Sequence, residues 1–99
     1  MRMEDDDVPK KILIVDDEQD PRTYLETLFR DNGYETATVS DGDEAWPKVQ
    51  EYKPDLITLD IIMARETGVK FYRKLCKDLE LAKIPVVICL CQLTGIQRL

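Results

Sequence analysis

The chain has 99 residues, 43% apolar and 34% charged, which is ordinary for one small soluble domain and leaves no room for a second. No apolar run approaches the roughly 20 residues of a membrane helix, and no secretory signal opens the chain, so we expect a cytoplasmic protein. The net charge of −6 disfavours nucleic-acid binding, and the absence of histidine excludes Ser-His and Cys-His catalysis.

Residues 1–9 are interpreted as an acidic lead-in and residues 10–99 as the folded domain. Four short segments of this domain are predicted to be strands. Three are rich in Ile, Val and Leu with little alternation, as parallel strands covered on both faces are, whereas one alternates polar and apolar residues and suits a sheet edge. In chain order they are Lys11–Val15, the alternating Glu35–Val39, Asp55–Leu59 and Pro85–Cys91.

Apolar residues at helical spacing lie between these strands. The three sets are Tyr24, Leu25, Leu28 and Phe29; Ala45, Val49 and Tyr52; and Val69, Tyr72, Leu75, Cys76 and Leu79. Asp20 before Pro21 predicts the N-cap of the first helix, and Asn32-Gly33 predicts its end. Pro47 falls near the first turn of the second helix, which we therefore expect to be short or irregular. The βαβαβαβ alternation predicts an α/β fold with a doubly wound parallel sheet.

Carboxylates follow two of the predicted strands. Asp16 and Asp17 end the first strand and Asp60 ends the third. Strands of an open parallel sheet deliver their carboxyl ends to one edge, where ligands bind, so these three carboxylates converge if the two strands are neighbours. An all-oxygen cluster suits a hard cation such as Mg²⁺. The alternative is that Asp16 and Asp17 merely cap the loop before the helix.

Four segments resemble the receiver (response-regulator) domain of two-component signalling, in their order and spacing. They are "KILIVDDE", "GYETATVSDGDEAW", "KPDLITLDIIM" and "IPVVI", from about Lys11 to Ile88, with Gly68 eight positions after Asp60. The resemblance implies a flavodoxin-like (CheY-like) sheet with strand order 2-1-3-4. It also implies that Asp60 accepts a phosphoryl group from a phosphohistidine on a sensor histidine kinase or phosphotransfer protein.

The same resemblance implies a Mg²⁺ site beside the acceptor Asp60. Asp17 would be a direct ligand, Asp16 a ligand directly or through water, and the backbone carbonyl of Ile62 a further ligand. Phosphoryl transfer depends mainly on alignment and charge neutralisation, so a carboxylate nucleophile beside a bound Mg²⁺ needs few other parts.

Several positions depart from the family pattern. Leu90 stands where receivers usually carry a Thr or Ser switch hydroxyl, which leaves Thr94 as the candidate, and Ala64 replaces a common proline. The chain stops at Leu99, before the family's fifth strand, its lysine and its fifth helix, so we expect slow or absent phosphorylation of the chain as it stands. The segment Pro85–Cys91 would then be a sheet edge through which two copies associate, unless the residues after it fold back over it.

Two other functions stay open. A degenerate receiver would keep the fold and act as a phosphorylation-independent protein-binding module. A Mg²⁺-dependent phosphatase or phosphotransferase is disfavoured because Ile61 and Ile62, rather than an acid or base, follow Asp60. The expected role is a phosphoryl acceptor that assists its own phosphorylation, not a multiple-turnover enzyme.

Overall fold

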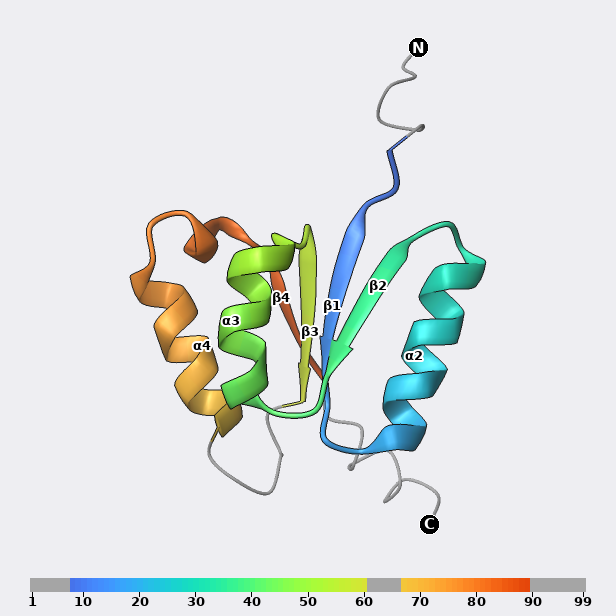
Figure 1. Cartoon of the computed structure of the whole chain (residues 1–99), viewed down its shortest axis with the longest axis horizontal. Helices are drawn as coiled ribbons and strands as arrows, with labels where there is room; N and C mark the ends of the chain where they lie inside the picture. Colours follow the sequence, from blue (N-terminus) through green and yellow to red (C-terminus); the bar gives the residue numbers. More distant parts are fainter. Residues whose placement is uncertain (1–7, 61–66, 90–99) are drawn as a thin grey trace.

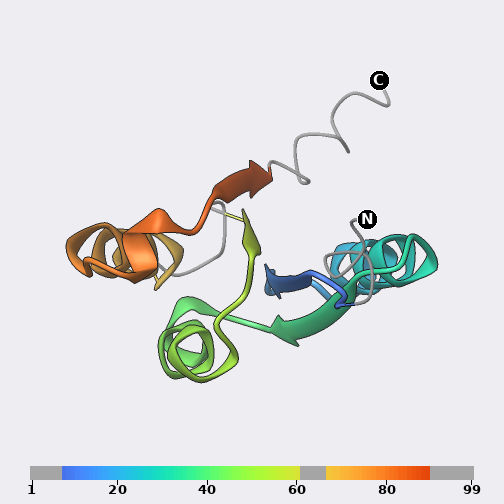
Figure 2. The same ribbon diagram turned by 90° about the horizontal axis from the view of Figure 1, so that it is seen from above.

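The computed structural model describes residues 8–60 and 67–89 of the chain. These residues form one twisted sheet with helices on both of its faces (Figure 1). Helix α2 (Gln19–Asp31) lies on one face, and helices α3 (Gly42–Tyr52) and α4 (Thr67–Lys77) lie on the other, as the view from above shows (Figure 2). Within the two described ranges, no helix is both long and apolar enough to cross a membrane.

The sheet contains four parallel strands among the described residues, in the order β2-β1-β3-β4. Their bounds are β1 (Lys11–Val15), β2 (Glu35–Val39), β3 (Leu56–Asp60) and β4 (Val86–Cys89). The predicted α/β class and 2-1-3-4 order are confirmed, and the alternating strand β2 is indeed at an edge. Val15 of β1 pairs with Val39 on one side and with Leu59 on the other, so the strands end level with one another.

Two predicted strand boundaries were wrong by small amounts. Strand β3 is shifted by one residue and includes Asp60, which pairs with Cys89 of β4. Strand β4 begins after Pro85, because proline has no N–H to donate, although the Pro85 carbonyl still accepts from the Ile57 N–H at 3.0 Å. Leu90 and Cys91 lie outside the described residues.

The hydrophobic core lies between the sheet and the α3/α4 layer. It is made of alternate strand residues and one stripe from each helix, namely Leu13, Val15, Val39, Ala45, Val49, Ile57, Leu59, Phe71 and Leu75. Full burial of a Leu, Ile or Phe side chain stabilises a fold by roughly 1.5–3 kcal/mol, so this layer contributes substantially to stability. Helix α2, by contrast, contains no buried residue although it covers the opposite face.

The start of helix α2 differs from the prediction. The N-cap is Glu18 rather than Asp20, because the Arg22 N–H already donates to the Glu18 carbonyl at 3.3 Å. Pro21 is therefore the third helical residue, where a missing N–H still costs nothing. The predicted end is confirmed: Asn32 is the C-cap, and Gly33 follows with φ of +90°, a conformation that favours glycine.

Helix α3 is longer and earlier than Pro47 led us to expect. It starts at Gly42, ahead of the proline, and runs for 11 residues. Its start is held by a capping arrangement, in which the Asp41 carboxylate accepts from the Glu44 N–H at 2.8 Å and the Glu44 carboxylate accepts from the Ser40 N–H at 2.9 Å. The first bond satisfies an N–H group that the helix start leaves open, and the second ties the residue before the N-cap to the first turn.

Helix α4 is rotated relative to the predicted apolar set. Phe71 and Leu75 are buried, whereas Tyr72 is 40% exposed and Leu79 lies beyond the helix at 88% exposed. Cations at i, i+3, i+4 and i+7 cover the outer side of the helix. These exposed residues are Lys70, Arg73, Lys74 and Lys77. The helix buries the stripe opposite the cations, because charged groups remain hydrated.

Candidate functional site

Three carboxylates meet at the carboxyl ends of the two central strands. Strands β1 and β3 are hydrogen-bonded neighbours. Asp16, which follows β1, and Asp60, the last residue of β3, therefore lie at the same end of the sheet. One oxygen from each of Asp16, Asp17 and Asp60 lies within 4.8 Å of the others. Asp16 and Asp60 are each 1% exposed, whereas Asp17 is exposed. The predicted convergence of the three side chains is confirmed; their roles stay predictions.

Asp16 forms hydrogen bonds through its N–H, its carbonyl and one of its carboxylate oxygens. Its N–H donates to the Val39 carbonyl at 3.2 Å, and its carbonyl accepts from Arg22 Nη1 at 2.8 Å. Its Oδ1 accepts from the Glu18 N–H at 2.9 Å, so the loop-capping alternative is also correct for this residue. Its Oδ2 is buried with no hydrogen-bond partner in the part of the chain that the structure describes.

The electrostatics of this cluster disfavour three unneutralised charges. The pKa of Asp16 is raised to about 6, mainly by burial and also by the charges of Asp60 and Asp17, while the hydrogen bond from the Glu18 N–H lowers it. A cation would offset this repulsion and supply the partner that Asp16 Oδ2 lacks. The donor set is entirely carboxylate oxygen, which fits Mg²⁺ and similar hard ions rather than zinc.

Other predicted site residues cannot be placed. Ile62 and Thr94 lie outside the described residues, as do Ala64 and Leu90. The predicted metal ligation by the Ile62 carbonyl and the predicted switch role of Thr94 therefore stay predictions.

Sequence reasoning missed Arg22, the side chain that contacts the main chain of Asp16. Arg22 lies in the first turn of helix α2 and is half-buried. A bond from a helix side chain to a main-chain oxygen six residues earlier has no sequence pattern of its own. Its nearest signal is the short distance along the chain between the paired acids and the helix.

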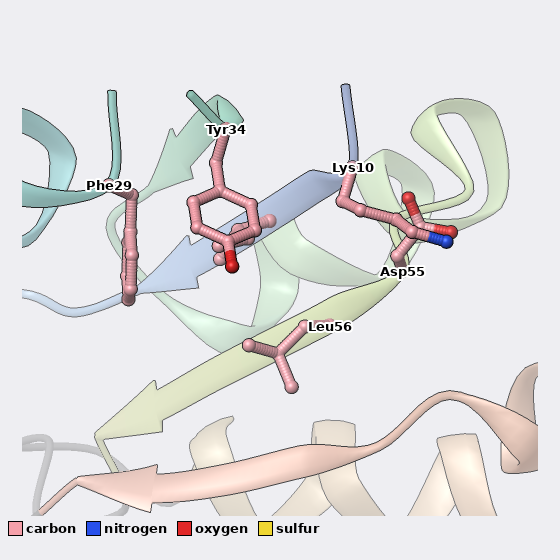
Figure 3. Close-up of a pocket in the computed structure, with 6 residues that line it drawn as sticks. Lys10, Phe29, Tyr34, Asp55 and Leu56 are labelled. Atoms are coloured by element: carbon pink, nitrogen blue, oxygen red, sulfur yellow. The ribbon is translucent and has the colours of Figure 1, made fainter. Parts of the chain in front are cut away.

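A second concavity lies at the opposite end of the strands. It is a hollow of about 380 Å³ lined by Lys10, Ile12, Phe29, Tyr34, Asp55 and Leu56. Figure 3 shows the rings of Phe29 and Tyr34 on one side and the Lys10 and Asp55 side chains on the other. Because Asp55 begins the segment that β3 continues, this hollow is separate from the acidic cluster at the far end of that strand.

Comparison with known proteins identifies related sequences. Residues 12–93 match the family model of the response regulator receiver domain. The chain is 41% identical over 75 residues to the alkaline phosphatase synthesis transcriptional regulatory protein PhoP of Bacillus subtilis, covering 76% of this chain and 30% of that protein. It is 32% identical over 81 residues to protein Rrf1 of Nitratidesulfovibrio vulgaris, covering 82% of this chain and 59% of that protein. The chain thus spans less than two thirds of either relative.

Solved structures share the fold. Chemotaxis response regulator CheY4 of Vibrio cholerae superposes with a TM-score of 0.76 at 31% identity, covering 82% of this chain and 68% of that one. The Mn²⁺-bound form of response regulator Rcp1 superposes with a TM-score of 0.71 at 27% identity, covering 81% of this chain and 64% of that one.

Proposed function

This chain belongs to the response regulator receiver domain family, and we propose that it accepts a phosphoryl group on Asp60 and signals by a change in conformation. The donor is a phosphohistidine on a sensor histidine kinase or phosphotransfer protein. The supporting observation is the meeting of Asp16, Asp17 and Asp60 at one end of the sheet. We assign this role to residues 10–99, with residues 1–9 as a lead-in.

In the proposed transfer, an Asp60 carboxylate oxygen forms a bond to phosphorus while the phosphorus–nitrogen bond of the phosphohistidine breaks. The departing imidazole keeps the electron pair of that bond and takes up a proton. The sheet position of Asp60, opposite Cys89, fixes the nucleophile at the end of a rigid strand. The transferred phosphoryl group stays on Asp60 of the chain itself, so the chain acts as an acceptor and not as a multiple-turnover enzyme.

The acidic cluster would hold Mg²⁺ through Asp16, Asp17 and Asp60, with the Ile62 carbonyl as a further ligand. The buried Asp16 Oδ2 without a hydrogen-bond partner among the described residues supports this assignment, as does the Mn²⁺-bound state of the similar Rcp1. When bound, the ion neutralises charge on the oxygens of the transferring phosphoryl group. Thr94 is proposed as the hydroxyl that bonds the phosphoryl group afterwards.

The test is incubation of the chain with acetyl phosphate and Mg²⁺, followed by mass measurement of the intact protein. We expect a single phosphoryl adduct that accumulates slowly, is lost in Asp60→Asn and is retained in Asp43→Asn, which changes an exposed carboxylate at the start of α3. An adduct that persists in Asp60→Asn contradicts the assigned acceptor. Absence of any adduct, with a kinase donor as well, would favour a binding module, and consumption of many equivalents would favour a phosphatase or phosphotransferase.

We further propose that two copies associate through strand β4. Among the described strands β4 lies at an edge of the sheet, and its Val87 and Ile88 side chains are 47% and 42% exposed. An apolar edge strand is a template for pairing with another chain.

The net charge of −6 makes a nucleic-acid partner for this domain unfavourable.

Sedimentation velocity over a concentration series tests this association. The wild type should form dimers that Val87→Lys weakens, because a charge on the edge opposes strand pairing. Tyr24→Lys is the matched control, since it adds the same charge at a residue of α2 that is 67% exposed. A wild type that stays monomeric at high concentration, or equal dimerisation of both variants, contradicts the proposal.

A further inference from the structure

Asp16 is the point at which strand β1 leaves the sheet. Its N–H is still bonded to the carbonyl of Val39, the last residue of β2, at 3.2 Å. Helix α2 begins at Gln19, so only two residues join Asp16 to the helix. Because this connection is so short, the orientation of Asp16 depends on the hydrogen bonds made around it.

Arg22 supplies two of those bonds. Its guanidinium Nη1 donates to the Asp16 carbonyl at 2.8 Å, and its backbone N–H donates to the Glu18 carbonyl at 3.3 Å. The Glu18 N–H in turn donates to Asp16 Oδ1 at 2.9 Å. One residue of the helix therefore holds both ends of the turn from Asp16 to Glu18, and the buried Oδ2 is the Asp16 oxygen left for another partner.

Arginine has properties that this position requires. Arg22 is half-buried, and a hydrogen bond from an ionised donor is stronger than one from a neutral donor. Its planar fork of donors is rigid, so less side-chain freedom is lost when the bond forms than for a lysine ammonium. Arg30 of the same helix serves elsewhere, because it pairs with Glu26 at 2.9 Å and donates to Thr36 Oγ1 at 2.8 Å.

We propose that Arg22 is a positioning residue of the acidic pocket, which fixes the main chain of Asp16 so that its buried carboxylate oxygen is presented to a divalent cation. The inference rests on the proposed Mg²⁺ site and names a residue that acts on that site through Asp16. Groups that are hydrogen-bonded to metal-binding residues commonly orient those residues toward the ion.

Charge and positioning predict opposite effects of removing Arg22. A guanidinium near the pocket repels a divalent cation, so loss of the charge alone would strengthen Mg²⁺ binding. Loss of the bond to the Asp16 carbonyl frees the turn, and ordering it again on binding weakens Mg²⁺ affinity. If Arg22 positions Asp16, the second effect exceeds the first.

The test is calorimetric titration of Mg²⁺ into the full chain. We expect Arg22→Ala to weaken Mg²⁺ binding about tenfold or more, Arg22→Lys to recover part of that loss, and Arg30→Ala to leave the affinity unchanged. Urea unfolding of each variant in EDTA measures stability without the ion. A loss of affinity in Arg22→Ala that exceeds any loss in Arg30→Ala, with folded protein in both, separates positioning from helix stability.

Unchanged or tighter Mg²⁺ binding by Arg22→Ala overturns the inference, as does a wild type that binds no Mg²⁺. If Arg22→Ala does not fold, Arg22→Lys decides: weaker binding than wild type supports positioning, and equal binding overturns it. The phosphoryl adduct is a separate measurement. A wild type that binds Mg²⁺ through this arrangement but takes no adduct refutes the proposed function and leaves the role of Arg22 standing.

Discussion

The Asp16 carboxylate is held where its own charge is unfavourable. It is 1% exposed, and its pKa is raised to about 6, first by burial and then by the neighbouring Asp60 and Asp17 charges. The unfolded chain has the ordinary value of 3.8, so the folded state binds this proton more tightly. The contribution of the Asp16 carboxyl group to the free energy of unfolding is therefore full at low pH. It declines as the pH rises from about 4 to about 6, by roughly 3 kcal/mol in all.

Asp16→Asn should consequently stabilise the protein when no divalent cation is present. Near pH 7.5 in EDTA we expect the free energy of unfolding to rise by up to about 3 kcal/mol, while near pH 4 the gain should vanish because Asp16 is then protonated. Urea denaturation at the two pH values measures this. Glu51→Gln, an exposed carboxylate of α3, is the control. A gain of equal size at both pH values contradicts the account.

The sequence was sufficient to predict which carboxylates meet, but not that they differ in solvent exposure. Acids at the ends of adjacent parallel strands converge in any such sheet, so Asp16, Asp17 and Asp60 were predictable. The burial of Asp16 and the exposure of Asp17 depend on the turn that Glu18 and Arg22 hold. The groups that form these bonds come within hydrogen-bond distance of one another only once helix α2 has packed against the sheet.

Helix starts show how local signals compete. Asp20-Pro21 carries a strong N-cap pattern, yet α2 begins earlier, at Gln19. The cap on α3 uses Asp41 and Glu44, a spacing of three that is a known helix-start pattern but was not recognised in the sequence. Local patterns therefore placed these helices correctly and misplaced their first residues.

Pro47→Ala should stabilise helix α3. Pro47 is the sixth residue of the helix, so it removes the N–H that would bond to the carbonyl four residues earlier. Because the side chain is exposed, little packing is lost, and we expect a gain of about 1–3 kcal/mol in the free energy of unfolding. Thermal or urea denaturation provides the measurement, with Gln50→Ala on the same helix as control. An unchanged or lower stability would show that the helix has adapted to the proline.

For the molecule as a whole, the alternation of strands and helices sufficed to predict the sheet, and the family resemblance supplied its strand order. The unequal covering of its two faces was not predictable. Leu25 and Phe29 repeat at helical spacing as core residues do, yet α2 buries none of its residues. Periodicity gives the apolar side of a helix, but the depth to which that side is buried depends on everything packed around it.

Mg²⁺ should raise the thermal stability of the whole domain, because the proposed ion site exists only in the folded chain. At 100 times the dissociation constant, the stabilisation is about 2.7 kcal/mol. Calorimetric scans with MgCl₂, and with NaCl at matched ionic strength, measure it. Asp17→Asn should remove most of the increase, because it takes one carboxylate out of the cluster. An equal increase with NaCl would indicate general screening instead of a site.

The central place of β1 in the sheet also sets the order in which the chain can assemble. Its first residue is tied to Asp55, 44 positions further on, through a bond of 2.8 Å between the Lys11 N–H and Asp55 Oδ2. Contacts between distant parts of a chain require costly loop closure and slow the folding reaction. A chain that is still being synthesised and does not yet include β3 has two of the three carboxylates and therefore no complete pocket. We therefore expect the site to be completed late in folding, after the long loop between β1 and β3 has closed.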